Sequence, residues 1–355
     1  MLPPEIQRIV LLIGLAAVGY LLILAWTEDM EAAKAPTVYS EAPLVSQQSP
    51  IPGEAQTTED EFAAVDSDIP PETVVQRTQT ATDTGRLVKV ETPVLEVWVD
   101  LLGGDIARVQ LPTYPISLEQ PDTPFLLMDR SAGRTYIAQS ALIGPDGIDK
   151  TGARPLYDVE KSTVTMASGG ELVLTTTLED AQVAKIFSFE PNSHLINIRY
   201  EVVNLADQPK NMRLLTQIKR DRLPPPTDET VPLAPSPYLG GALTTPDNNY
   251  EKVDFDDLDE GSFKAATVGG WMAFLQHYFL TAWVAPADQA TNYLARKTSD
   301  GFYLFGFTGQ NQSIPSGATG VWQADFYAGP KDQVVLENIA PVSYTHLRAH
   351  ETVRN

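Results

Sequence analysis

Hydrophobic and polar residues alternate with a period of two along most of the chain beyond residue 86. The alternation is clearest in four segments, at 94–102, 171–180, 195–203 and 321–329. Clusters of turn-forming residues separate such segments, at 103–105, 144–147, 190–193 and 300–301. Alternation interrupted by turns is typical of antiparallel strands with one buried face. The pattern predicts an all-β domain over residues 86–341, a large antiparallel sandwich of two sheets.

Two segments of this region depart from the alternation. Residues 223–237 contain six prolines and predict a surface loop, because proline cannot enter the interior of a sheet. Residues 331–340 (KDQVVLENIA) follow a Gly-Pro pair and predict a short helix at the end of the domain.

The first 26 residues predict a membrane anchor. Residues 9–26 carry no charge, and a helix of this length spans about 27 Å, close to a hydrocarbon core of about 30 Å. Arg8 precedes the stretch and three acidic residues follow it closely, so we expect the N-terminus in the cytoplasm and the main domain outside. A cleaved signal peptide is the alternative, but its apolar core is usually shorter. The anchor residues that we single out are Ile9, Leu12, Leu15, Leu22 and Trp26.

Residues 27–85 and 342–355 follow neither pattern. The first segment holds six prolines, few large apolar residues and twelve acidic residues against Lys34 and Arg77, a net charge of −10. Too little apolar surface is available to offset the loss of chain entropy, so we predict a disordered acidic linker. The segment 342–355 lacks both the alternation and the acidity, and we interpret it as a non-native tail.

Charge and composition exclude several classes of function. The net charge of −21 repels phosphate backbones, so nucleic acid is not an expected partner. The chain has no cysteine, which excludes disulfides, thiolate zinc sites and cysteine nucleophiles. It also lacks the motifs of phosphate-binding loops, dinucleotide-binding folds, serine hydrolases and zinc proteases.

The densest acidic cluster, residues 254–260 (DFDDLDE), invites a calcium interpretation. A calcium loop that starts at Asp254 needs Gly at its sixth position and Glu at its twelfth, where the chain has Asp259 and Ala265. We therefore expect a solvated acidic turn and no metal or cofactor.

The histidines give little basis for catalysis. His194 lies in a turn and is expected to be exposed, and His346 and His350 fall in the tail. His277 lies in residues 269–279 (GGWMAFLQHYF). Sandwich proteins of the sugar-mutarotase type use a histidine with a carboxylate to move a proton, but no partner for His277 is evident. We therefore interpret this stretch as sandwich core, entered through a tight glycine turn, and the protein as no enzyme.

Several stretches in this order resemble the Gram-negative form of the YidC family of inner-membrane protein insertases. They follow the anchor and the linker, and read VETPVLEVWVDLLGGDIARVQLPTYP, SALIGPDG, RPLY, YLGGALTTPDNNYEKVDF, GGWMAFLQHYFLTAW and YAGPK. The similarity covers residues 1–341. The residues that carry it are Gly103, Gly104, Tyr250, Gly269, Gly270, Trp271, Gln276, Tyr278, Phe279, Trp283, Gly329 and Pro330.

The resemblance implies a mutarotase-like super-sandwich in the periplasm, between a first transmembrane helix and a membrane domain of five helices. In this family the helical domain performs the insertion, and we expect the chain to stop before it. The chain would then be the anchor and periplasmic docking domain of an inner-membrane insertase. The expected partners are the Sec translocon with its accessory subunits, nascent membrane proteins and the lipid bilayer, and residues 238–283 are the expected partner surface.

Two alternatives remain open from the sequence. One is a periplasmic carbohydrate-binding or mutarotase-like protein. The other is a membrane-anchored, chaperone-like domain that binds unfolded segments in a sandwich cleft.

Overall fold

The computed structural model describes residues 85–117, 119–131, 133–149, 154–224, 238–248 and 250–332. All of them belong to one compact unit, Thr58–Asn355. Several predicted segments lie outside the described residues: the anchor 1–26, the linker 27–85 except Gly85, most of the loop 223–237, most of the helix 331–340, and the tail 342–355. Within the described ranges, no helix has the length and apolar character needed to cross a bilayer.

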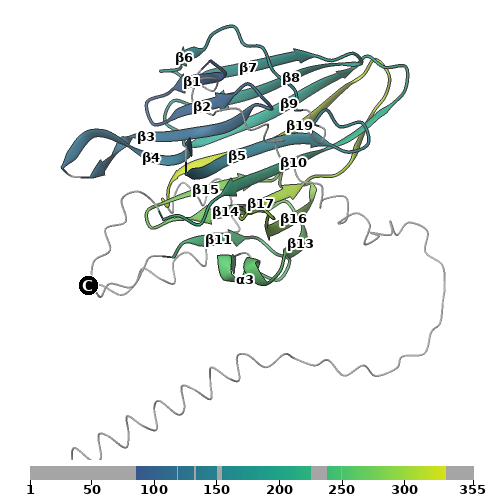
Figure 1. Ribbon diagram of the computed structural model, residues 1–355. Helices are drawn as coiled ribbons and strands as arrows, with labels where there is room; N and C mark the ends of the chain where they lie inside the picture. The colour runs from purple at the N-terminus through teal and green to yellow at the C-terminus, as the bar shows by residue number, and fades with distance from the viewer. Residues whose placement is uncertain are drawn as a thin grey trace, which may run out of the picture. The chain divides into compact units, whose positions relative to one another are not determined.

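The larger of two sheets has eleven strands (Figure 1). Its order is β13-β16-β17-β10-β5-β4-β3-β2-β1-β6, and β18 also pairs with β10. The bounds are β1 Leu87–Glu91, β2 Glu96–Asp100, β3 Asp105–Ser117, β4 Gln120–Ser131, β5 Arg134–Ile143, β6 Thr163–Thr165, β10 Lys210–Arg220, β13 Phe263–Val268, β16 Ala290–Lys297, β17 Tyr303–Thr308 and β18 Gln312–Ile314.

The smaller sheet has eight strands, in the order β12-β11-β14-β15-β19-β9-β8-β7. The bounds are β7 Gly170–Thr177, β8 Ala181–Phe189, β9 Leu195–Asn204, β11 Gly240–Leu243, β12 Glu251–Val253, β14 Trp271–Leu275, β15 Phe279–Val284 and β19 Thr319–Pro330. β19 therefore joins two groups of strands, because β15 pairs with one of its edges and β9 with the other.

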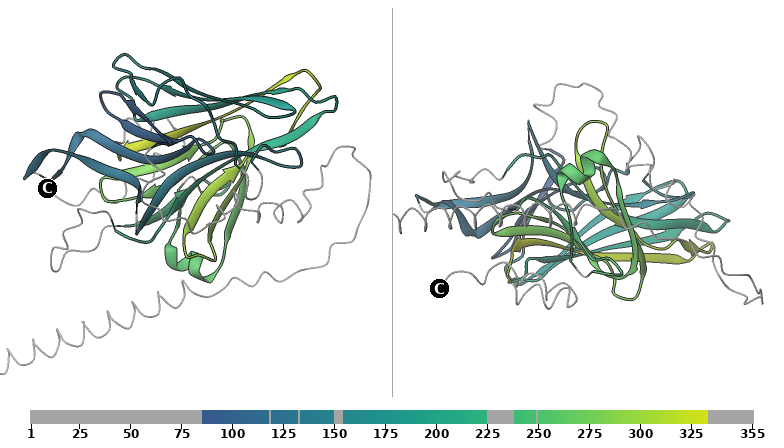
Figure 2. Two further views of the ribbon diagram at one scale, coloured as in Figure 1. Left: turned by 45° about the horizontal axis from the view of Figure 1, so that its top comes forward. Right: turned by 90° about the horizontal axis from the view of Figure 1, so that it is seen from below.

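The two sheets pack face to face around one large apolar core, so the predicted all-β, two-sheet sandwich is confirmed (Figures 1 and 2). Both sheets contribute: Val97 and Val99 of β2 and Ile196 and Ile198 of β9 are all buried. The alternation read from the sequence is therefore the pattern of inward-facing residues. The pairing is antiparallel with one exception, since β1 and β6 run parallel, with Val90 opposite Val164.

The strand β14 is buried on both faces, unlike an ordinary strand of a two-layer sandwich. Met272 and Phe274 face the main core. The other face joins a second apolar cluster, whose buried members are Ala242, Trp271, Ala273, Leu275, Leu280, Ala282 and Tyr327. A strand buried on both sides reads as a continuous apolar run, which is why residues 271–275 show no alternation.

The acidic cluster 254–260 is a short helix, α3 (Phe255–Glu260), and not the solvated turn that we expected (Figure 2). Phe255 and Leu258, three residues apart, are both buried on one side of it. The carboxylate of Asp257 accepts a hydrogen bond of 2.9 Å from the backbone N–H of Asp254, which caps the first turn. The expectation failed because two apolar residues among five acids still give the segment a buried face.

Candidate functional site

Most of the motif residues lie on or beside three neighbouring strands of the eight-stranded sheet, β14, β15 and β19, although they come from distant stretches of the sequence. Gly269 and Gly270 turn the chain from β13 into β14 with φ of 64° and 94°, values that favour glycine. A Cβ on Gly269 would lie 2.9 Å from the backbone of Ala287. Beyond the β14–β15 hairpin, Phe279 pairs with Pro330 and Leu280 with Gly329, which places the two motif blocks side by side.

The turn of the β14–β15 hairpin, residues 276–278, is called the tip below. Gln276 is buried, whereas the rings of His277 and Tyr278 are exposed and stack on each other with centroids 4.0 Å apart. Tyr278 is 67 % exposed, so the interpretation of this stretch as core is wrong for His277 and Tyr278. It is right for β14 and for Phe279. The difference arises because β14 ends at Leu275 and the turn leaves the sheet before β15 begins.

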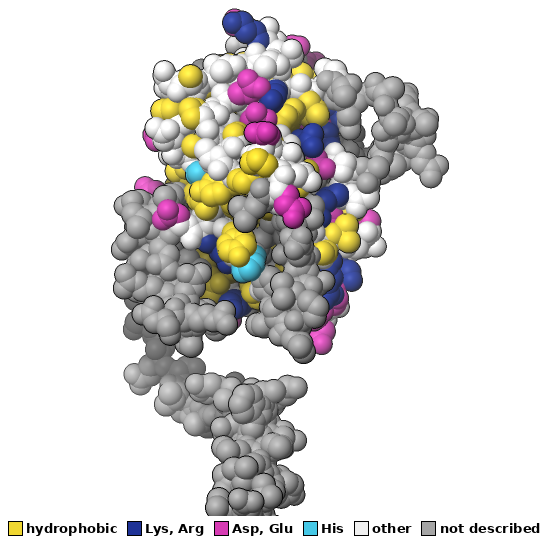
Figure 3. All heavy atoms as spheres, turned by 90° about the vertical axis from the view of Figure 1, so that its left-hand side faces the viewer, with side chains coloured by type: hydrophobic (Ala, Val, Ile, Leu, Met, Phe, Trp, Pro, Cys, Tyr) yellow, Lys and Arg dark blue, Asp and Glu magenta, His cyan; other side chains and the backbone are white. Residues whose placement is uncertain are grey.

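An aromatic cluster lies under the tip and joins the two sheets. Phe279 stacks on Phe125 of β4 with ring centroids 4.3 Å apart, and meets Tyr114 of β3 edge-on at 5.3 Å. His194 lies 6.3 Å from Tyr114 and 6.2 Å from Tyr327. Figure 3 views the end of the molecule at the left of Figure 1 and shows hydrophobic side chains gathered around the histidines on this face.

His194 is half-buried, which corrects the expectation that it is exposed. Burial lowers the pKa of its ring below the ordinary value. The carbon atoms of His194 also occupy the space that a Cβ on Gly329 would need, at 2.6 Å. The motif glycine Gly329 therefore makes room for His194.

Tyr250 and Trp283 pack on opposite faces of this group of strands, the partly buried Tyr250 against the second apolar cluster and Trp283 in the main core. The ring of Tyr250 lies 5.9 Å from that of Trp271 in the second apolar cluster, and burial raises its pKa to about 12. Trp283 is buried in the main core, 4.9 Å from Phe326 of β19.

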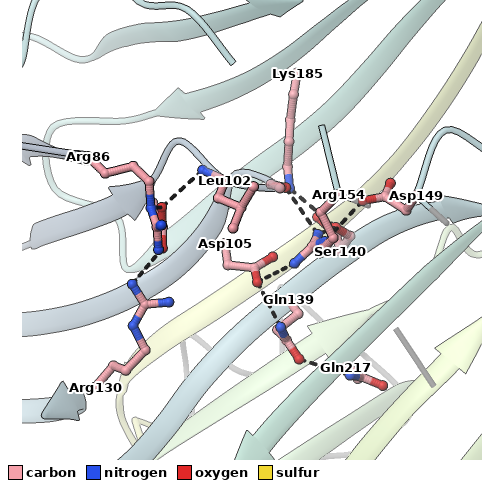
Figure 4. Close-up of polar contacts among 12 residues, drawn as sticks. Arg86, Leu102, Asp105, Arg130, Gln139, Ser140, Asp149, Arg154, Lys185 and Gln217 are labelled. Atoms are coloured by element: carbon pink, nitrogen blue, oxygen red, sulfur yellow. Dashed lines mark hydrogen bonds and ion pairs between the residues drawn. The ribbon is translucent and has the colours of Figure 1, made fainter. Parts of the chain in front are cut away.

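Gly103 and Gly104 belong to a different place, a buried charged cluster formed by Asp105, Asp149, Arg154 and Lys185 (Figure 4). Arg154 pairs with Asp105 and with Asp149, the latter with Nε 3.1 Å from Oδ1. Its NH2 group also donates to the carbonyl oxygens of Gly103, at 3.2 Å, and of Ser140, at 3.0 Å. The guanidinium thus fixes three segments of the larger sheet.

Lys185 is the only member of the charged cluster that comes from the smaller sheet. Its ammonium group donates to the carbonyl oxygens of Gly103 at 2.9 Å and Ser140 at 3.4 Å, so it ties β8 to the other layer. Burial lowers the pKa of Lys185 to about 7, and Asp105 offsets part of that decrease. Burial likewise raises the pKa of Asp149, against the opposing charge of Arg154.

The two glycines leave the space that the side chains of Arg154 and Lys185 occupy. Gly103 and Gly104 have φ of 77° and 66°. A Cβ on Gly103 would lie 2.1 Å from the guanidinium carbon of Arg154, and one on Gly104 would lie 2.7 Å from Cδ of Lys185. The sequence singled out the glycines and the stretch RPLY, which begins with Arg154, but it gave no role to Arg154, Asp149 or Lys185. The available signal was a lysine at an inward-facing position of the alternating strand β8.

Neither place has the composition of a catalytic or metal site. The charged cluster is closed to solvent, and each of its carboxylates is engaged by Arg154. His277 stacks on Tyr278 in an exposed turn. Among the residues that the structure describes, no group of three His, Asp or Glu side chains is placed to hold a metal ion.

Comparison with known proteins supplies the family. The model of the YidC periplasmic domain matches residues 87–348. The membrane protein insertase YidC of Azotobacter vinelandii is 38 % identical over 343 residues, and that of Stutzerimonas stutzeri is 37 % identical. Each match covers 95 % of this chain and 60 % of the relative, so the chain spans about three fifths of the relatives' length.

The solved structures that match this chain have low sequence identity to it. A galactose mutarotase related enzyme from Lactobacillus acidophilus has a TM-score of 0.43 and 12 % identity, over 68 % of this chain and 97 % of that one. A galactose mutarotase-like protein from Lactobacillus casei has a TM-score of 0.42 and 11 % identity, over 69 % of this chain and 99 % of that one. The match over residues 87–348 is what assigns the family: the chain belongs to the YidC family and contains its periplasmic domain.

Proposed function

We propose that this chain is the anchor and periplasmic part of a membrane protein insertase. The observation that carries the proposal is the match of the YidC periplasmic domain over residues 87–348, together with relatives that are named membrane protein insertases. The proposed activity is then to assist the insertion and folding of membrane proteins, and not to convert a small-molecule substrate. The exposed position of His277 supports this choice over a mutarotase-like activity.

The proposed organisation follows the sequence. Residues 1–26 anchor the chain with the N-terminus in the cytoplasm, residues 27–85 link the anchor to the domain, and residues 86–341 form the domain in the periplasm. The charge distribution around the apolar stretch 9–26 supports this orientation. Accessibility of the domain to protease added outside spheroplasts tests it, and a domain that stays protected would reverse the orientation.

A direct test of insertion uses cells depleted of their own insertase. The chain, joined to the part of the Azotobacter vinelandii relative that it does not cover, should restore insertion of inner-membrane proteins. The chain by itself should not, because we place the inserting machinery in the missing part. Full restoration by the chain alone would show that the docking role is wrong.

We further propose that the tip faces a partner of the insertase, either the Sec translocon or a nascent client. The side chain of Tyr278 is exposed and mostly apolar. The residue lies next to the end of β19, because the backbone N–H of Lys331, which follows β19, donates to the backbone carbonyl oxygen of Tyr278 at 2.9 Å. An exposed aromatic residue, here stacked only on the ring of His277 among the described residues, is well suited to an interface.

Site-specific photo-crosslinking tests the partner surface. A crosslinker at position 278 should capture translocon subunits or nascent membrane proteins in cells. Val173, on the edge strand β7 at the opposite side of the same sheet, is 44 % exposed and provides the control position. Equal capture from both positions would indicate nonspecific contact and would remove the tip from the proposal.

A further inference from the structure

Arg220, the last residue of β10, is a completely buried arginine whose guanidinium pairs with no carboxylate of the described residues. Its Nε donates to the carbonyl oxygen of Asp221 at 2.9 Å, and its NH2 group donates to that of Leu223 at 2.9 Å. Its NH1 group is buried and makes no hydrogen bond to any described residue. An unpaired buried cation is costly, so its surroundings must compensate the charge.

The surroundings compensate Arg220 only in part. The rings of Tyr136 and Phe274 lie 4.5 Å and 5.2 Å from the guanidinium carbon, in the range of cation–π attraction. The carboxylate of Asp221 attracts the charge, but its two oxygens accept from backbone N–H groups of Thr135 and Leu223. Burial lowers the pKa of Arg220, which remains a cation in need of an anion.

A second positive charge strengthens this imbalance. Arg134 donates from NH1 to the carbonyl oxygen of Pro224 at 2.7 Å, on the same loop that receives the guanidinium of Arg220. Its charge opposes that of Arg220 and contributes to the lowered pKa of the buried group. Arg134 therefore adds positive charge at the loop 221–224, which also contains Asp221 and whose Arg222 pairs with Asp256 and Asp259.

Gln276, in the tip, adds unused donors at the same place. Burial raises the pKa of the Tyr136 hydroxyl, and the buried side chain of Gln276 beside it offsets part of that rise. Neither polar atom of the amide has a hydrogen bond of good geometry within the described residues. The hydroxyl of Tyr136 shares its own bond of 2.7 Å with Thr281. Arg220 and Gln276 thus both border Tyr136. Beyond that contact, the NH1 group of Arg220 and the amide of Gln276 have no hydrogen-bond acceptor among the described residues.

We propose that Arg220 and Gln276 form a binding site for a small oxyanion of the carboxylate or phosphate class. Such an anion supplies what both side chains lack, acceptor oxygens and one negative charge. The site is bordered by the loop 221–224 and by the tip, whose neighbouring residues Leu223 and Tyr278 are exposed, so local opening of these two segments gives access. The assignment does not depend on the proposed insertase function.

Thermal unfolding of the detergent-solubilised chain, followed by tryptophan fluorescence, tests the site. Sodium phosphate and sodium acetate are titrated against sodium chloride at constant ionic strength. Phosphate or acetate should raise the unfolding midpoint in a saturable way, by about 5 °C at roughly 100-fold excess over the dissociation constant. No saturable response to either anion means that a water molecule suffices there, and overturns the proposal.

Three variants locate the response. Gln276→Glu places a carboxylate beside the guanidinium, so it should raise the midpoint without added anion and remove the anion response. Arg220→Met should also remove the response, and if it does not fold, Gln276→Glu decides alone. Arg199→Met is the matched control, because Arg199 is an arginine of β9, outside the loop 221–224 and the tip, that pairs with Glu201. An anion response that survives in Gln276→Glu would place the site elsewhere.

Discussion

At the residue scale, two glycines and one lysine determine how charge is buried between the sheets. Gly103 and Gly104 leave no side chain where Arg154 and Lys185 must lie. Lys185 in turn meets backbone carbonyl groups of the opposite layer and forms no ion pair with a carboxylate among the described residues. Hydrogen bonds to backbone carbonyl groups therefore hold the charged cluster together as well as the ion pairs of Arg154 do.

Gly103→Ala should lower the free energy of unfolding by about 2–4 kcal/mol, because it adds both backbone strain and a collision with Arg154. Gly301→Ala is the control: Gly301 has a similar φ of 85°, and a Cβ there would meet nothing within 4 Å. Its cost should stay near about 1 kcal/mol. Urea unfolding of both variants checks the comparison, and equal losses would reduce the effect to backbone strain alone.

The stability of the domain should increase with pH between about 7 and the ordinary lysine value, because of Lys185. Its folded pKa is lowered to about 7 and its unfolded pKa is 10.5, so in this range the unfolded chain binds more protons. The slope is at most about 1.4 kcal/mol per pH unit, the value for one proton. Lys185→Met should abolish it, as measured by urea unfolding at pH 7.0, 8.0 and 9.5.

Lys252→Met, a change at an exposed position, serves as the control and should keep the wild-type slope. The series stops at pH 9.5 because burial raises the pKa of Tyr157 and of Tyr200 well above the ordinary value. Above their unfolded pKa these tyrosines reverse the trend. A slope that persists in Lys185→Met would assign the proton to another group.

At the element scale, the β14–β15 hairpin places an exposed residue, Tyr278, directly before a buried one, Phe279. Phe279→Ala removes a buried ring that stacks on Phe125, and should cost about 3–5 kcal/mol of unfolding free energy. Tyr278→Ala should change it by no more than about 0.5 kcal/mol, because that ring is exposed. Chemical denaturation of the pair measures the difference, and a large loss at Tyr278 would mean that its stacking on His277 stabilises the hairpin.

The elements that could be predicted are those with one buried face. Alternation identified β2, β7, β9 and β19, since each presents one side to the core and one to solvent. It missed the double burial of β14, because a continuous apolar run does not say which partners cover its two faces. It missed α3, because two apolar residues give too short a pattern to reveal a helical period.

The candidate site could be anticipated only in part, for a similar reason. The motif residues were singled out without a place in the fold, and the pairing of Phe279 with Pro330 shows that two of the separate blocks lie side by side. The exposure of Tyr278, and the burial of Arg220, depend on where strands end and on contacts between distant segments. Such contacts leave no local signature in a single sequence.

At the scale of the whole molecule, the last strand decides whether the smaller sheet exists. β19 pairs with β15 along one edge and with β9 along the other, so removing it separates the sheet into two groups of strands. A chain that ends at residue 318 should therefore remain unfolded and be digested rapidly by protease. Limited proteolysis of purified chains provides the measurement.

The control for this truncation is a chain that ends at residue 341, beyond β19. It should resist protease as the whole chain does, because we interpret residues 342–355 as a non-native tail. Rapid digestion of this longer chain would instead assign the tail a part in the fold. Resistance of the shorter chain would show that β15 and β9 close on each other without β19.

The central place of β19 also sets the order of events during synthesis. Residues 319–330 form the last of the described strands to leave the ribosome, and β15 and β9 must wait for them before their facing edges are paired. Growing chains shorter than this expose two unfinished sheet edges, which attract other extended segments. These edges stay unpaired until β19 has been made, so we expect this domain to depend on a chaperone that binds such edges until then.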